Sequence, residues 1–210
     1  NFTPLMIAAQ FNECEIIEAL LKIRKVDINN SFNDNQRNAL MIAAKYGNYE
    51  AVQMLIANNA ELNETDILGM TALMMACKNK NENIAILLLE QRNCDVTIKD
   101  NNKRTALFYA VTNGLPECVN LLLEKGADPN HRDNMKRNIF IESCKRGYFG
   151  IAKSLVKKGA RIDALDSDGN NGMMLAAHGG YVNIVKFLFK KKVLDVNAKN
   201  KNGQTALFMA

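Results

Sequence analysis

Apolar residues recur along the chain in short runs with the spacing of one helix face. The run at residues 71–77 (TALMMAC) returns at residues 105–111 (TALFYAV) with the same order of polar, small and large side chains. Equivalent phrases start at residues 3, 38, 71, 105, 138, 171 and 205, so successive starts are 33 to 35 residues apart. Self-similarity at such a period is typical of repeat architectures. We therefore expect one repeating unit throughout the chain and no second domain.

Each unit is expected to contain two antiparallel helices and a polar loop. The Thr or Asn that opens the phrase is a good N-cap, and Pro4 suits a first helical turn. Small residues such as Ala43 and Ala44 allow close approach, and a second apolar pattern, as at residues 118–123, follows a turn. The closing loop, as at residues 126–130, is rich in turn-forming residues and should project as a finger. Two helices cannot bury both their apolar faces alone, so the units must stack.

This reading gives an all-α solenoid of stacked helix-turn-helix units with hairpin-like loops, forming a single array. We expect the array to be truncated at both ends, since residue 1 lies two residues before a phrase and residue 210 falls inside the last predicted helix. The expected repeats lie near residues 1–32, 33–65, 66–99, 100–132, 133–165 and 166–199, with a partial repeat at 200–210.

The repeated phrase resembles the ankyrin repeat, which has a T-P-L-H-x-A pattern and a period near 33 residues. The resemblance extends over essentially the whole chain and is closest at residues 100–132. One departure is consistent: the His that often follows T-P-L in the family is replaced by Met6, Met41, Met74, Phe108, Ile141, Met174 and Phe208. We expect these side chains to pack between adjacent repeats and a polar network at the finger bases to be missing.

Composition adds little to the expected fold and function. The 210 residues are 48% hydrophobic and 23% charged, as in soluble folded proteins, and no apolar stretch is long enough to span a membrane. No secretory signal is visible, and the cysteines form no C-x-x-C pair, which favours the cytoplasm, or alternatively the nucleus, over an oxidising compartment. The cysteines expected to be small buried side chains are Cys77, Cys94, Cys118 and Cys144.

No pattern of catalytic residues is recognisable. His131 and His178 have no acid or nucleophile at a diagnostic spacing, and the glycine-containing segments do not match phosphate-binding loops. Asp166 and Asp168 lie in a loop without the Gly and Glu spacing of a calcium site. We expect no catalytic residue, no cofactor and no metal site, and hence a protein that is not an enzyme.

The resemblance implies a binding surface made of finger tips and the exposed ends of the inner helices, on the concave side of the array. Carried over residue by residue, it gives these candidate partner-binding residues: Arg37, Lys45, Tyr46, Ile67, Leu68, Met70, Lys78, Arg104, Arg132, Met135, Lys136, Arg137, Lys145, Arg146 and His178. They include an exposed apolar tip made of Ile67, Leu68 and Met70 near Tyr46, and a basic cluster made of Arg104, Arg132, Lys136, Arg137, Lys145 and Arg146.

We therefore expect a monomeric, non-catalytic scaffold that binds another protein, with the basic cluster forming a groove suited to an acidic, partly apolar segment. The net charge of +5 agrees with an acidic partner. One alternative is that RNA or another phosphorylated ligand binds the same groove and stacks on Tyr46 or Tyr109, although aromatic residues are sparse. A further alternative is the regulatory array of a larger enzyme or channel.

Overall fold

The structure, a computed structural model, describes residues 2–23, 25–31 and 33–210. By its internal contacts the chain divides into two compact units, residues 1–101 and 102–210, and each is described by itself. Residues 1 and 32, the expected bounds of the first repeat, lie outside the described residues. Every regular element in the described part is a helix, apart from two isolated β-bridges in unit 2, Arg132 to Asn138 and Leu165 to Asn171.

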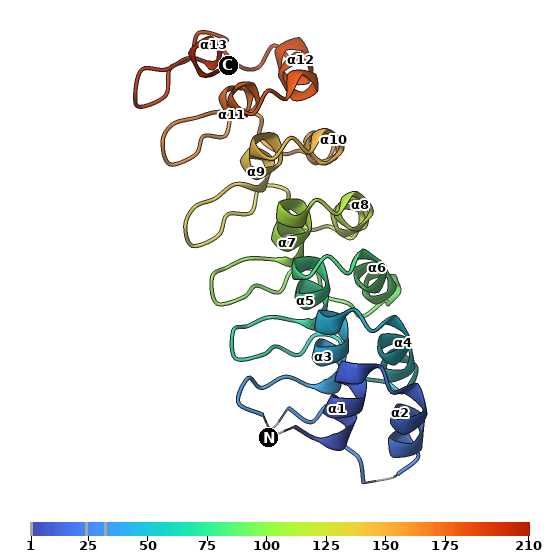
Figure 1. Cartoon of the computed structure of the whole chain (residues 1–210). Helices are drawn as coiled ribbons and strands as arrows, with labels where there is room; N and C mark the ends of the chain where they lie inside the picture. The colour runs from blue at the N-terminus through green and yellow to red at the C-terminus, as the bar shows by residue number, and fades with distance from the viewer. Residues whose placement is uncertain (1, 24, 32) are drawn as a thin grey trace. The chain divides into compact units, whose positions relative to one another are not determined.

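In unit 1 three inner helices form one layer and three outer helices form a second layer, with loops projecting from the inner layer (Figure 1). The inner helices are α1 (Pro4–Phe11), α3 (Ala39–Tyr46) and α5 (Ala72–Lys78), and the outer helices are α2 (Cys14–Leu21), α4 (Tyr49–Ala57) and α6 (Glu82–Glu90).

Unit 2 repeats this arrangement, as the green-to-red part of Figure 1 shows. Its inner helices are α7 (Ala106–Asn113), α9 (Ile139–Lys145), α11 (Gly172–His178) and α13 (Ala206–Met209), and its outer helices are α8 (Pro116–Glu124), α10 (Phe149–Lys157) and α12 (Val182–Lys190). The predicted all-α fold of stacked helix pairs is confirmed within each unit.

The inner helices begin where the sequence pattern placed their caps. The Thr71 hydroxyl accepts a hydrogen bond from the backbone N–H of Met74 at 3.2 Å, and Asn38 Oδ1 accepts one from Met41 at 2.9 Å. Each bond satisfies a backbone donor that the first turn of a helix leaves free. The cap residue therefore decides locally where each inner helix starts.

The large apolar residues that replace the family's His are almost all buried, as predicted. Phe208 is the exception, with 72% of its surface exposed, because it lies on the short last helix α13. Cys77, Cys118 and Cys144 are also buried as expected, whereas Cys94 is partly exposed because it lies in the loop after α6. The six buried replacements are Met6, Met41, Met74, Phe108, Ile141 and Met174.

The prediction that the finger bases lack a polar network is wrong. The fingers are residues 33–37, 66–70, 100–104, 133–137, 166–170 and 200–204. The first residue of a finger holds its backbone: Asp66 Oδ1 accepts hydrogen bonds from the N–H groups of Leu68 and Met70, both at 2.9 Å. Asp133 and Asp166 do the same in their own fingers. An Asp or Asn at this position supplies the polar network without the missing His.

Candidate functional site

The candidate residues divide between the two units, and each expected cluster lies within one of them. Unit 1 contains Arg37, Lys45, Tyr46, Ile67, Leu68, Met70 and Lys78. Unit 2 contains Arg104, Arg132, Met135, Lys136, Arg137, Lys145, Arg146 and His178.

The apolar tip of unit 1 is smaller than expected. Ile67 and Leu68 are about half exposed, at 51% and 49%, and Tyr46 is similarly exposed, with Lys45 Nζ 4.9 Å from its ring centroid. Met70 is buried, so the prediction that it is exposed is wrong. The bond from its N–H to Asp66 turns the chain back toward the inner helices and carries the Met70 side chain into the core.

Arg37 is held by a structural ion pair. Its guanidinium donates two hydrogen bonds to Asp66 Oδ2, at 2.9 and 3.0 Å, and the Asp66 side chain is fully buried. A buried carboxylate needs such a partner, because leaving it unpaired is costly. Arg37 therefore joins the first finger to the second and is not a free cation for a partner.

In unit 2 the buried carboxylate of Asp133 pairs with two of the cations in the basic cluster. Arg137 Nη2 lies 2.6 Å from Asp133 Oδ2, and Arg104 Nε lies 3.9 Å from the same oxygen. Both guanidinium groups also lie over the ring of Phe108, at 5.8 Å for Arg104 and 4.9 Å for Arg137. Burial opposes ionisation of Asp133, but hydrogen bonds and charge from Arg137 outweigh it and lower the pKa of Asp133.

A third cation of the cluster is paired on the helix surface. Arg146 Nε donates to Glu142 Oε2 at 3.2 Å, one helical turn away. The three remaining cations have no carboxylate within salt-bridge distance among the described residues: Arg132, Lys136 and Lys145. The expected basic groove is thus reduced to these three side chains.

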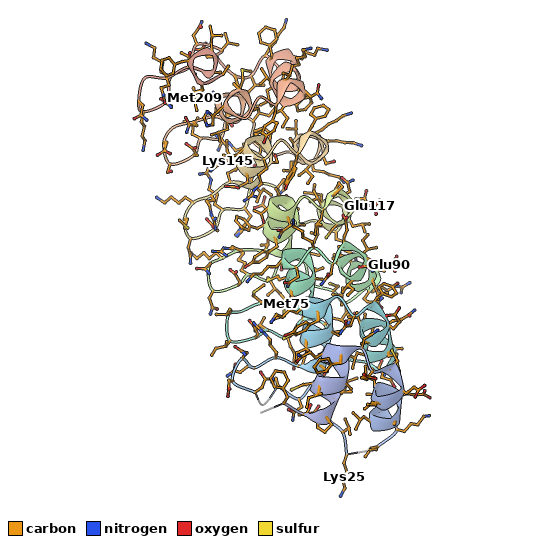
Figure 2. All side chains as sticks on the ribbon, in the orientation of Figure 1. Lys25, Met75, Glu90, Glu117, Lys145 and Met209 are labelled. Carbon is orange, nitrogen blue, oxygen red and sulfur yellow. The ribbon has the colours of Figure 1, made fainter. Side chains whose placement is uncertain are left out.

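The three unpaired cations share one hollow of about 340 Å³ between neighbouring fingers of unit 2. Its lining joins Arg132, Lys136 and Lys145 to Met135 and Arg137, so five of the candidate residues meet there. Lys145 lies at the end of inner helix α9 (Figure 2). Apolar, acidic and neutral polar residues complete the lining: Ile141, Leu165 and Leu175, Glu142, Asp166 and Asp168, and Asn138 and Ser167. The remaining unit 2 candidates, Arg104, Arg146 and His178, do not line it.

The sequence interpretation missed Leu165, although a signal for it is present. Leu165 precedes the first residue of a finger, where four other repeats have a polar residue and the first repeat has Phe32; the polar residues are Thr65, Lys99, Arg132 and Lys199. Leu165 is apolar and 50% exposed, so half of its surface is not used in the core of unit 2. Comparing the repeats position by position would have identified it.

The described residues contain no group of three or more His, Cys, Asp or Glu side chains arranged to hold a metal ion. Burial raises the pKa of the Cys144 thiol to about 12, so its reactive thiolate is suppressed at neutral pH. Over the same described residues, no helix combines the length and apolar character needed to cross a bilayer. The unit 2 hollow brings five of the predicted partner-binding residues together, and we take it as the candidate site.

Comparisons with known proteins place these observations in a family. The family model described as "Ankyrin repeats (3 copies)" matches residues 1–66, 58–133 and 140–210. Inversin from dog is 34% identical over 123 residues, which is 58% of this chain but 11% of inversin. A probable E3 ubiquitin-protein ligase from rice, XBOS33, is 40% identical over 85 residues, 40% of this chain and 16% of that protein.

Solved structures agree on the fold. The crystal structure of the ankyrin repeat domain of Bcl-3 matches with a TM-score of 0.80 and 24% identity, covering 100% of this chain and 94% of that domain. At that identity the likeness supports the fold alone. The family model, however, extends from residue 1 to residue 210 with only a short gap, and the caps, helix pairs and fingers follow its repeat. The chain belongs to the ankyrin-repeat family.

Proposed function

We propose that this chain is a non-catalytic scaffold that binds an acidic segment of a partner protein at the hollow in unit 2. Ankyrin repeats are in general protein-interaction modules, and this chain matches the ankyrin-repeat family model over most of its length. The single observation that carries the proposal is that three unpaired cations and exposed Met135 meet at one hollow of about 340 Å³.

The electrostatics favour an acidic ligand on one wall. Arg132, Lys136 and Lys145 are exposed and lack carboxylate partners among the described residues, so they can form charge-assisted hydrogen bonds with an incoming carboxylate. Arg137 contributes much less, since Asp133 already neutralises it. The recognition charge is therefore carried by Arg132, Lys136 and Lys145.

A matched pair of double variants tests this proposal. Arg132→Glu with Lys145→Glu reverses two unpaired charges at the hollow, whereas Lys153→Glu with Lys157→Glu makes the same net change on outer helix α10. Capture of an acidic partner from the source cell should be lost in the first variant and retained in the second, with unchanged circular dichroism in both. Equal capture by the two variants would show that the cations at the hollow do not bind the partner.

Binding of RNA or another phosphorylated ligand to the same cations is the alternative. Tyr109 is buried, at 5% exposure, so the stacking surface expected of it is absent, and Tyr46 belongs to unit 1. Phosphate contacts release counterions, so affinity for a single-stranded RNA should fall steeply between about 50 and 200 mM salt if this alternative holds. RNA binding that shows this salt dependence and is lost in Arg132→Glu with Lys145→Glu would favour it.

The array can also serve as the interaction part of a larger enzyme or channel. The rice relative is named a probable E3 ubiquitin-protein ligase, and the match covers 16% of that protein. In that arrangement the hollow recruits a substrate or regulator while another domain acts on it. Activity of the full-length protein that depends on Arg132 and Lys145 toward one partner but not toward a generic substrate would support this role.

A further inference from the structure

Neighbouring fingers are joined by a backbone hydrogen bond near their tips. The bond runs from an N–H of the later finger to a carbonyl of the earlier finger, at about the same place each time. Four such bonds are present: Ile67 to Asn35 at 3.0 Å, Asn101 to Leu68 at 3.0 Å, Asn134 to Asn102 at 2.9 Å and Lys201 to Asp168 at 3.0 Å.

A side chain often adds a second link from one finger to the next. The last residue of a finger reaches the first residue of the following finger, as Arg37 reaches Asp66 at 2.9 Å. Arg104 lies 3.9 Å from Asp133 in the same way, and Asn200 Nδ2 donates to Asn170 Oδ1 at 2.8 Å. These links hold adjacent fingers together near their bases.

The junction between fingers 133–137 and 166–170 has neither link. The register of the other junctions calls for a bond from Ser167 N–H to the Met135 carbonyl, and none joins these two described residues. Arg137, which should reach forward to Asp166, instead bonds back to Asp133 in its own finger. Asp166 is satisfied within its finger by Asn170 Nδ2 at 3.0 Å. The hollow of about 340 Å³ opens at this unlinked junction.

Two exposed apolar side chains line the opening. Met135 is 70% exposed and Leu165 is 50% exposed, one on each side of the junction. At the position of Met135 three other fingers have Asn, and at that of Leu165 four other repeats have polar residues and the first has Phe32. No other junction combines two apolar residues at these positions, so the repeat does not require the pair. The Asn residues at the Met135 position are Asn35, Asn102 and Asn202.

We infer that this open junction is an anchor seat for an extended partner segment that places one leucine-sized side chain between Met135 and Leu165 and an adjacent carboxylate at Arg132, Lys136 and Lys145. The inference rests on the proposed function and names the ligand class of the same hollow. The segment's main chain takes the place of the missing inter-finger bond, accepting from Ser167 N–H and donating to the Met135 carbonyl, as in strand addition to a sheet edge. Burial of the leucine-sized side chain in the apolar seat, formed by Met135 and Leu165, supplies affinity. The three cations select segments with acidic residues beside that side chain.

The probe is a fluorescein-labelled, terminally blocked hexapeptide, AEDLDA, compared with AEDNDA and AKKLKA by fluorescence anisotropy. We expect AEDLDA to bind, and the other two peptides to bind about tenfold more weakly or worse, as expected when one leucine-sized burial or the matched charges are lost. Failure of AEDLDA to bind, or equal binding of AEDLDA and AEDNDA, overturns the inference.

The protein variants use residues that this chain already places at the same positions. Met135→Asn with Leu165→Thr, which leaves the charge unchanged, should weaken AEDLDA binding about tenfold or more with an unchanged melting temperature. Leu68→Asn, at the position equivalent to Met135 but in unit 1, is the matched control and should bind like the wild type. If Arg132→Glu with Lys145→Glu abolishes binding while Met135→Asn with Leu165→Thr does not, the proposed function stands and the apolar seat is wrong.

Discussion

The guanidinium of Arg137 contacts the buried carboxylate of Asp133 through two nitrogens, at 2.6 Å from Nη2 and 2.7 Å from Nε. The same carboxylate accepts the backbone N–H groups of Met135 and Arg137, at 3.0 and 2.9 Å. One side chain therefore shapes the finger, neutralises a cation of the basic cluster and keeps that cation from the next finger.

Asp133→Ala should destabilise unit 2. It removes the acceptor of two backbone donors and leaves Arg137 without its carboxylate, which we expect to lower the free energy of unfolding by about 2 kcal/mol. Full burial of the pair would cost more, but the Arg137 side chain is 35% exposed. Urea unfolding followed by circular dichroism measures the change. Asp168→Ala, at an exposed position in the next finger, is the control and should change stability little.

The two kinds of cation in the cluster should behave differently on charge reversal. Arg137→Glu places a second carboxylate against buried Asp133, so we expect the free energy of unfolding to fall by about 2 kcal/mol or more. Lys145→Glu alters an exposed side chain without an ion pair among the described residues, and should stay within about 0.5 kcal/mol of the wild type. Thermal melting of the two single variants checks this. Equal melting temperatures would mean that Arg137 is as free as Lys145.

Stability should depend on pH through Asp133. The pKa of its carboxyl is lowered in the folded state, so its contribution is fully present above the unfolded value of about 3.9 and is lost as pH falls through the lower folded value. The difference in unfolding free energy between the wild type and Asp133→Asn should thus be largest near neutral pH and shrink below about pH 4. Urea titrations at several pH values measure it. A difference that stays constant down to pH 3 would contradict the assigned role.

Gly147→Ala should be destabilising although the change is one methyl group. Gly147 has φ +74°, and an added Cβ would collide with the ring of Tyr181. Left-handed backbone and overpacking together should cost about 2 kcal/mol. Gly150→Ala is the control, because Gly150 lies in helix α10 and its added Cβ meets nothing within 4 Å. There Ala should raise stability by up to about 1 kcal/mol, since Gly is a poor helix former. Chemical denaturation of both variants decides between a local backbone effect and a general intolerance of Gly replacement.

The sequence by itself determined the features that depend on neighbours along the chain. The repeat period, the caps at Asn38 and Thr71, the helix pairs and the burial of residues such as Met74 all follow from local spacing and polarity, and all were predicted. The candidate binding surface was inferred from the same repeat and stays a prediction. Leu165 was also partly within reach, because four of the five equivalent residues are polar and only Phe32 is also apolar.

The tertiary structure decided which of the residues predicted to be exposed are available to a partner. Arg137 and Lys145 were both predicted to belong to the basic groove, but only Arg137 forms an ion pair with a buried carboxylate. Met70 is buried, and the bond from its N–H to Asp66 turns the chain toward the inner helices. The junction beside Met135 lacks a side-chain link, because Arg137 bonds to Asp133 in its own finger and not to the next finger. Charge pairing and burial act through space between repeats, so residue type and spacing fix a candidate's position but not its partner.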